Sequence, residues 1–167
     1  VEDRRRVPTI RLDEALDGTR PDFVTMDIQG AEALAIAGGR RSLSEALIIE
    51  TEVEFVEQYR GQPMFGDIDC ALRALGFVLH QFTGYATRAM RPVVIGDDPT
   101  TGVNQWLWAD AVYMVDPARW DALSPRRLRG LAALMHDAYE SWDIAYAALL
   151  RADRDDGDKS APTYLAD

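Results

Sequence analysis

The stretch DFVTMDIQGAEAL, residues 22–34, joins a short apolar strand to a turn and a helix. A buried strand is expected over Phe23–Ile28, yet Asp27 stands near its end. Gly30 permits a sharp turn, and Glu32 falls in the first turn of the helix that follows. In open α/β sheets, ligands bind just outside the carboxyl ends of the strands, where such turns lie. The stretch is therefore the first candidate for a functional site.

This stretch begins a strand–helix–strand unit. The helix is expected over Ala31–Ala37, and a second apolar, β-branched run covers Ala46–Val53. Such a unit implies parallel strands joined by a right-handed crossover. Two later runs, Phe77–Phe82 and Ala111–Val115, also have the length and composition of strands, so the pattern predicts an α/β layer fold. Other expected elements are a weak strand at Val7–Leu12, a helical turn at residues 12–16, a loop at residues 55–64 and a helix at Asp67–Leu75.

The composition is that of one soluble globular domain. The chain has 167 residues, of which 47% are hydrophobic and 28% are charged, and this suffices for one core. No apolar run approaches the roughly 18 residues that span a bilayer, so no membrane partner is expected. A formal charge of −10 argues against a nucleic-acid partner, because phosphate backbones are bound by clustered lysine and arginine. The single cysteine, Cys70, excludes an intrachain disulfide and predicts a cytoplasmic protein.

Three segments are expected along the chain. Residues 1–117 hold the predicted strands and form the α/β domain. Residues 118–152 form a helical extension, in which Ser124 is the N-cap and Pro125 the first helical residue. Residues 153–167 are polar and charged, which predicts a flexible acidic tail.

Two interpretations of the turn after the first strand stay open. In the first, Asp27 and Gln29 offer a carboxylate and an amide to a polar ligand, and Gly30 lets the backbone approach it closely. In the second, Asp27 is a cap, Gly30 is a turn residue, and Glu32 complements the helix dipole. Residue types alone do not separate these two interpretations.

The segment ETEVE places three carboxylates on one face of the second strand, at Glu50, Glu52 and Glu54. Neighbouring carboxylates repel each other unless they are solvated, paired with arginine or bound to a metal. A crevice position is expected for Glu50 and Glu52, and a solvent-exposed position for Glu54. No metal site is predicted, although Mg²⁺ stays an option if Asp27 and Glu50 lie close together.

The next loop contains YRGQPMF, residues 59–65, which combines aromatic rings, a guanidinium and an amide. A loop of this kind after a strand can form a substrate lid, in which Tyr59 and Gln62 would contact the substrate. An ordinary surface loop with two aromatic rings tucked beneath it is the alternative.

An ordered series of segments resembles the later half of FkbM-type methyltransferases. The segments are TIRLDEAL, DFVTMDIQGAEALAIAGG, LIIETEVEFVEQYRGQPMFGDIDCALRALGFVL and WADAVYMVDP, which fall within roughly residues 7–117. The family's hallmark is an Asp-x-Glu-Gly-x-Glu segment that follows a Leu-Asp pair. Leu12-Asp13 and Asp27-x-Gln29-Gly30-x-Glu32 match it, with Gln29 in place of the usual Glu.

The resemblance implies a Rossmann-like fold that uses S-adenosylmethionine, often to O-methylate a hydroxyl of a sugar or natural product. The implied roles are catalysis by Asp27 and Glu32, cofactor binding by Asp27, Gln29 and Gly30, and substrate binding by Glu50, Glu52, Tyr59 and Gln62. The family's glycine-rich cofactor loop is not found in the sequence, so the chain is expected to be a carboxyl-terminal half that lacks the first three strands. The expected sheet is mostly parallel, with Ala111–Val115 antiparallel between Ala46–Val53 and Phe77–Phe82.

Two other functions are weighed. A haloacid-dehalogenase-type phosphatase is disfavoured, because Gln29 replaces its second aspartate and the chain's only lysine, Lys159, lies in the tail. A truncated half that acts as a non-catalytic interaction module is the other alternative. The first strand would present an open edge, which favours a homodimer or poor solubility. The remaining expected partner is a small-molecule or saccharide acceptor.

Overall fold

The computed structural model describes residues 6–98 and 100–165, so the first five residues of the predicted α/β domain lie outside the described part. Within that part, the sheet has the strand order β1–β2–β4–β3. The strands are β1 (Phe23–Met26), β2 (Ile48–Glu54), β3 (Phe77–Arg88) and β4 (Gln105–Val115). The helices are α1 (Leu12–Ala15), α2 (Glu32–Gly38), α3 (Arg40–Leu43), α4 (Phe65–Arg73), the 3-10 helix η1 (Pro117–Ala122), α5 (Pro125–Tyr139), α6 (Trp142–Asp156) and α7 (Ser160–Tyr164).

The order and directions of the strands agree with the prediction, but the description of the sheet as mostly parallel is wrong. β1 pairs parallel with β2, whereas β4 pairs antiparallel with both β2 and β3. β1, β2 and β3 therefore point the same way. Because β4 is inserted between β2 and β3, β1–β2 is the one parallel pair in the described sheet.

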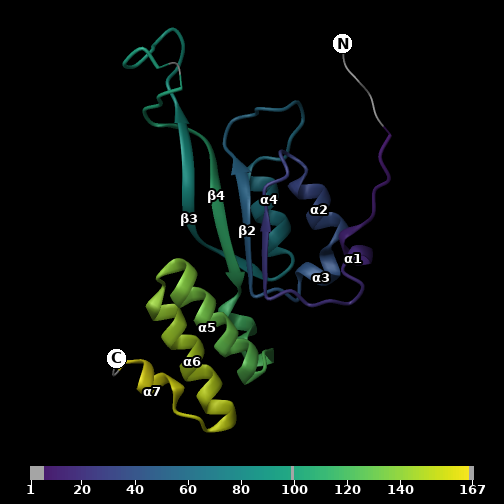
Figure 1. Ribbon diagram of the computed structural model, residues 1–167, viewed down its shortest axis with the longest axis vertical. Helices are drawn as coiled ribbons and strands as arrows, with labels where there is room; N and C mark the ends of the chain where they lie inside the picture. Colours follow the sequence, from purple (N-terminus) through teal and green to yellow (C-terminus); the bar gives the residue numbers. More distant parts are fainter. Residues whose placement is uncertain (1–5, 99, 166–167) are drawn as a thin grey trace.

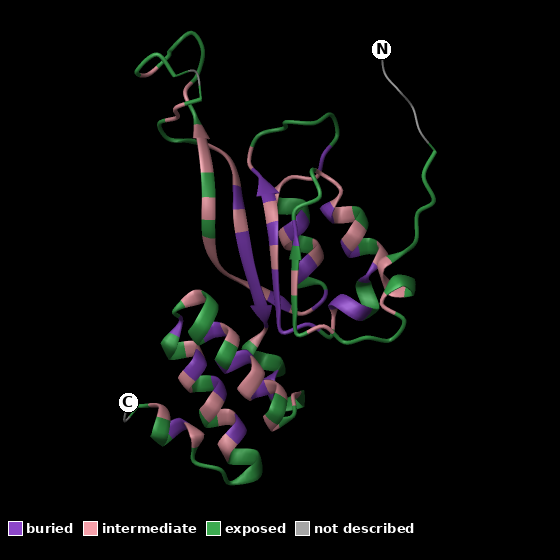
Figure 2. Cartoon of the chain, viewed as in Figure 1, coloured by how far each residue is buried: buried purple, intermediate pink, exposed green. Residues whose placement is uncertain are grey.

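Helices pack on both faces of the sheet. On one face, Ile49 and Tyr113 belong to an apolar cluster with residues of α2 and α4. On the other face, Ile48, Val112 and Met114 pack against the α5–α6 hairpin, which Figure 1 shows below the sheet. Figure 2 shows that buried residues concentrate in β2 and β4, the two central strands. Among the described residues, no helix combines the length and the apolar character needed to cross a membrane.

The start of α5 is as predicted from local sequence. The Ser124 hydroxyl accepts a hydrogen bond from the backbone N–H of Arg127, and Pro125 occupies the first helical position. The helix ends at Tyr139, the C-cap residue Glu140 has a left-handed φ of 51°, and α6 begins at Trp142. The left-handed residue ends the first helix, so the helical extension forms a hairpin.

The weak strand expected at Val7–Leu12 is wrong. Residues 6–11 have no regular structure, and Leu12 begins α1. Val7 and Ile10 are exposed. An isolated apolar run does not form a strand when no neighbouring strand pairs with it.

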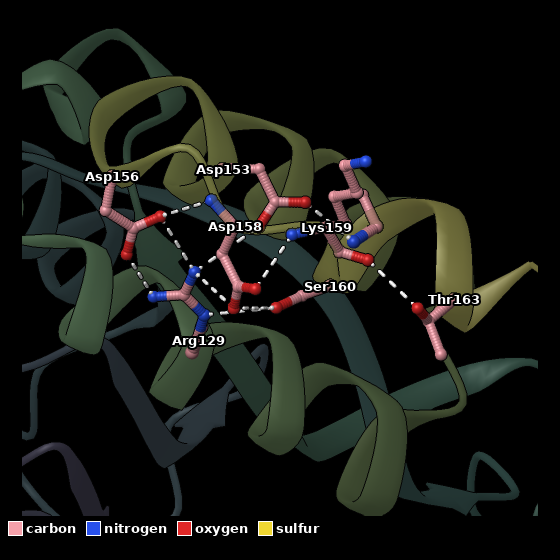
Figure 3. Close-up of polar contacts among 8 residues, drawn as sticks. Arg129, Asp153, Asp156, Asp158, Lys159, Ser160 and Thr163 are labelled. Carbon is pink, nitrogen blue, oxygen red and sulfur yellow. Dashed lines mark hydrogen bonds and ion pairs between the residues drawn. The ribbon is translucent and has the colours of Figure 1, made fainter.

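The tail expected from residue 153 onward is helical over most of its described length. α6 continues to Asp156, and α7 follows after a short turn. Figure 3 shows Arg129 of α5 donating hydrogen bonds to Asp153, Asp156 and Asp158. Charges that suggest disorder in the sequence are thus paired with one guanidinium in the fold. The final two residues of the predicted tail lie outside the described part of the chain.

Candidate functional site

The turn between β1 and α2 has a left-handed backbone. Gln29 has a φ of 56° and Gly30 a φ of 91°, values that glycine adopts freely and other residues adopt at a cost. The backbone N–H of Ile28 donates to Oε1 of Glu32 at 2.9 Å, which closes the turn. Asp27 is exposed at the carboxyl end of β1, where it accepts a hydrogen bond from Nε2 of Gln29 at 2.6 Å.

Glu32 lies beneath this turn. Its side chain is 0% exposed, and its Oε2 has no hydrogen-bond partner among the residues that the structure describes. A carboxylate with no access to solvent is out of reach of a ligand in an open crevice. Its position therefore suits it to hold the turn.

The loop after β2 folds over the same turn. Oε1 of Gln62 accepts hydrogen bonds from the backbone N–H groups of Gln58, at 2.8 Å, and Tyr59. The Tyr59 hydroxyl donates to Oε1 of Gln29 at 3.3 Å. A Cβ atom added to Gly30 would lie 3.5 Å from Cβ of Gln62. The structure thus brings Tyr59 and Gln62 against the predicted turn.

Four partly exposed carboxylates, here called the acidic face, lie on the side of the sheet that also carries α5 and α6: Asp27, Glu50, Glu52 and Asp110. Glu52 and Asp110 are directly opposite in the register of β2 and β4. The register of β1 and β2 places Asp27 beside Glu52. Asp27 and Glu50 lie on one side of the sheet, as predicted, because side chains alternate along a strand. In the part of the chain that is described, no group of three or more His, Cys, Asp or Glu side chains is arranged to hold a metal ion.

Crowding changes the protonation of the acidic face. Burial, followed by the nearby negative charges, of which Asp27 has the largest effect, raises the pKa of Glu52 to about 7. Burial also raises the pKa of Asp110, with added contributions from Glu50 and Asp27. A carboxyl group with a pKa of about 7 exchanges its proton readily at neutral pH, which is the property of a general base.

The solvent-exposed position expected for Glu54 is wrong. Its side chain is 1% exposed, because β2 extends to Glu54, which pairs with Trp108 of β4. Burial and the charge of Glu32 raise the pKa of Glu54, while the neighbouring Gln62 amide lowers it. Glu54 is thus a buried carboxylate beneath the loop after β2.

Glu50 is held by hydroxyl groups from two other elements. Its Oε1 accepts from Thr83 of β3 at 3.1 Å, and its Oε2 accepts from Tyr139 at the end of α5 at 2.7 Å. Burial and the hydrogen bond to Glu50 raise the pKa of Tyr139. Close by, the Ser141 hydroxyl lies 2.6 Å from Nε2 of His80 on β3. The turn between α5 and α6 is therefore attached to the edge of the acidic face.

Tyr139→Phe is expected to lower the free energy of unfolding by about 1–2 kcal/mol, because Oε2 of Glu50 loses a donor while the carboxylate stays partly buried. Urea denaturation measures the change. Tyr85→Phe is the matched control, since Tyr85 is 61% exposed and its ring stacks on Trp106. Equal stability of the two variants would show that the Tyr139–Glu50 hydrogen bond adds nothing to the fold.

Sequence reasoning misses three residues of this site: Thr83, Asp110 and Tyr139. Asp110 carries a usable signal, because it is the lone acid in the apolar segment LWADAVYMV. The sequence around Thr83 and Tyr139 gives no signal that these residues belong to the site. Their contacts depend on how β3 pairs with β4 and on where the helical hairpin docks.

One comparison with known proteins finds a match in the first part of the chain. Residues 1–79 match the family model of the Methyltransferase FkbM domain. The matched segment contains β1, β2 and the turn that lies between Asp27 and Glu32. Neither the curated proteins nor the solved structures gave a match. The FkbM match confirms the resemblance to this methyltransferase family for the segment that contributes Asp27 and Glu52 to the site.

Proposed function

We propose that this chain supplies the acceptor side of a methyltransferase that uses S-adenosylmethionine to methylate a hydroxyl group of a sugar or another natural product. The observation that carries the proposal is the meeting of Asp27 and Glu52 at the carboxyl ends of two parallel strands within the FkbM-matched segment. Ligands of open α/β sheets bind at such strand ends. The family match indicates methyl transfer as the class of reaction. The carboxylates of Asp27 and Glu52 at the strand ends are suited to that reaction.

Glu52 is the group best suited to take the proton of the acceptor hydroxyl. Methyl transfer to oxygen is an in-line displacement, which needs an aligned oxygen and the loss of its proton. The pKa of Glu52, about 7, lets its carboxylate accept that proton near neutral pH. Asp27 is exposed beside it and would orient the acceptor by accepting a hydrogen bond from a neighbouring hydroxyl of the same molecule.

The chemistry of the turn after β1 also suits the cofactor. S-adenosylmethionine supplies an electrophilic methyl group on a positively charged sulfonium, and the acidic face offers the opposite charge. Asp27 and Gln29 would hold the ammonium and carboxylate of its amino-acid end, while Gly30 leaves room for a close backbone approach. Glu32 serves as a positioning residue, because it is fully buried and fixes the N–H of Ile28.

In this proposal the loop after β2 lies on the acceptor side of the site. Tyr59 is 52% exposed and offers its ring and hydroxyl to a saccharide. Gln62 is buried and supports the loop through its hydrogen bonds to backbone N–H groups. Glu50, held by two hydroxyls, fixes the far end of the acidic face.

Transfer of labelled methyl groups from S-adenosylmethionine to a panel of saccharides and hydroxylated natural products tests the proposal. We expect an O-methylated product whose formation is strongly reduced by Asp27→Asn. Asp17→Asn is the matched control, because Asp17 is exposed, has a left-handed backbone like the turn after β1, and lies outside the site. Label on nitrogen, sulfur or carbon, or a rate that Asp27→Asn leaves unchanged, would overturn the assignment.

We also propose that the outer edge of β1 pairs with a second copy of the chain. β1 is an edge strand of the described sheet. Phe23, its first residue, is 40% exposed, and Ile28, which follows the strand, is 43% exposed. Open backbone groups on an edge strand invite such pairing. Phe23→Lys is expected to weaken the dimer about tenfold or more, which sedimentation equilibrium measures. Val103→Lys, at an exposed position before β4, is the control. A wild-type protein that stays monomeric at all concentrations would contradict this proposal.

A further inference from the structure

Four arginines line a cleft at the amino ends of β1 and β2. The acidic face lies at the other end of these strands. The cleft consists of two hollows, of about 340 Å³ and about 540 Å³, which share Arg20, Ser124 and Arg127 as lining residues. Arg119 lines the first hollow and Arg126 the second. We call Arg20, Arg119, Arg126 and Arg127 the arginine cleft.

Positive charge exceeds negative charge in this cleft. The acidic residues that line the two hollows are Glu45 in the first and Asp22 in the second. Four guanidinium groups and two carboxylates leave a positive surplus, in a chain whose formal charge is −10. Ser124 caps the first turn of α5, whose helix dipole adds partial positive charge at the same place.

The arginines keep donors that the fold does not use. Arg127 donates through Nη2 to the Glu45 carbonyl. Its Nη1 lies 3.7 Å from Asp22, and Nη1 of Arg20 lies 3.8 Å from Glu45, both longer than a hydrogen bond. Arg20 can therefore turn toward another anion at the cost of one long ion pair, and Nη1 of Arg127 can donate to an anion while Nη2 keeps its bond to Glu45.

Arg119 holds the cleft wall in place. Its Nη1 donates to the carbonyl oxygens of Leu75, at 2.8 Å, and Gly76, at 3.2 Å. This use of one nitrogen fixes the guanidinium while its other nitrogens stay available, since guanidinium carries five N–H donors. A guanidinium held in this way beside the exposed side chains of Arg20 and Arg126 is well suited to an anion with several oxygens.

We propose that the arginine cleft binds a phosphate group. Arginine forks match the oxygens of phosphate, and several charge-assisted hydrogen bonds to one anion reinforce each other. Asp22 precedes β1 and Ala46 precedes β2, so the cleft lies at the amino ends of the strands, away from Asp27 and Glu52. The phosphate site is thus separate from the proposed methyl-transfer site and does not depend on it.

Calorimetric titration of the whole chain at fixed ionic strength tests the site, with inorganic phosphate and adenosine monophosphate as the two probes. We expect saturable binding that the double variant Arg20→Gln/Arg126→Gln weakens about tenfold or more. These two positions are chosen because Arg119 and Arg127 also donate to backbone carbonyl oxygens of the fold. Circular dichroism checks that the variant is folded.

The control is the double variant Arg40→Gln/Arg154→Gln, which removes two exposed arginines outside both proposed sites and the same total charge. Tighter binding of inorganic phosphate would identify free phosphate as the ligand, and tighter binding of adenosine monophosphate would identify a phosphate ester. The absence of saturable binding with both probes, or equal weakening by both double variants, would overturn the proposal.

Discussion

Glu32→Ala is expected to destabilise the protein by about 3 kcal/mol and to disable the site at the end of β1. The substitution removes the acceptor of the Ile28 N–H, leaves that donor unpaired, and opens a cavity beneath the turn. Gln29 stays left-handed only while its surroundings hold it there. Without Glu32, the turn relaxes and Asp27 loses its position. Equilibrium unfolding in urea measures the loss of stability.

Glu32→Gln separates the hydrogen bond from the charge. The amide oxygen of glutamine can still accept from Ile28, and the loss of negative charge relieves repulsion with Glu54. We expect the stability of this variant to lie within about 1 kcal/mol of the wild type. If the alanine and glutamine variants proved equally unstable, the charge of Glu32 and not its bond to Ile28 would be what the fold requires.

Glu52→Gln is expected to slow methyl transfer by about 10²-fold to 10⁴-fold while it stabilises the protein at neutral pH. A loss of that size is typical when a positioned general base is removed. The rate of the wild type should rise with pH through about 7, as Glu52 loses its proton. A glutamine variant with the wild-type rate and the same pH profile would remove Glu52 from the mechanism.

The gain in stability follows from the proton balance of Glu52. Its pKa is raised from the ordinary value of 4.5 to about 7 in the fold. Between these pH values the folded protein keeps a proton that the unfolded chain has released, so stability falls as the pH rises through this window. Glutamine does not titrate, so the Glu52→Gln variant does not lose this stability as the pH rises.

Because Glu52 is partly exposed, solvent screening reduces the gain to about 1 kcal/mol above the window, or about 2–4 °C in Tm, and to nothing below it. Thermal unfolding on both sides of the window measures it. Glu14→Gln, at an exposed carboxylate of α1, is the control. A gain of equal size at every pH would point to a cause other than the proton on Glu52.

The elements that could be predicted from the sequence are those fixed by local chemistry. The apolar run before Asp27, the glycine at position 30 and the apolar run at residues 46–53 each specify their own conformation, and β1, the turn and β2 follow from them. Ser124 and Pro125 specify the start of α5 in the same way. The position of Asp27 beside Glu52 then follows from the parallel register of the two strands.

The rest of the site depends on contacts between distant parts of the chain. Glu54 is buried because the longer β4 runs beside it, and nothing in ETEVE indicates that length. Asp110 joins the acidic face only through the antiparallel register that sets it opposite Glu52. The helix at residues 153–156 is stabilised by Arg129, which lies on another helix. In each case the deciding partner is remote in sequence, so local patterns carry no information about it.

The hydrogen bond between Glu50 and Tyr139 joins residues that are 89 positions apart. During synthesis, the strand that carries Glu50 leaves the ribosome well before the helix that carries Tyr139, since chains emerge from the amino end at about 5–20 residues per second. During that interval Glu50 lacks one of its two hydroxyl donors. Translation order therefore places the α5–α6 hairpin after all four strands of the described sheet, and the acidic face is complete only when the hairpin docks.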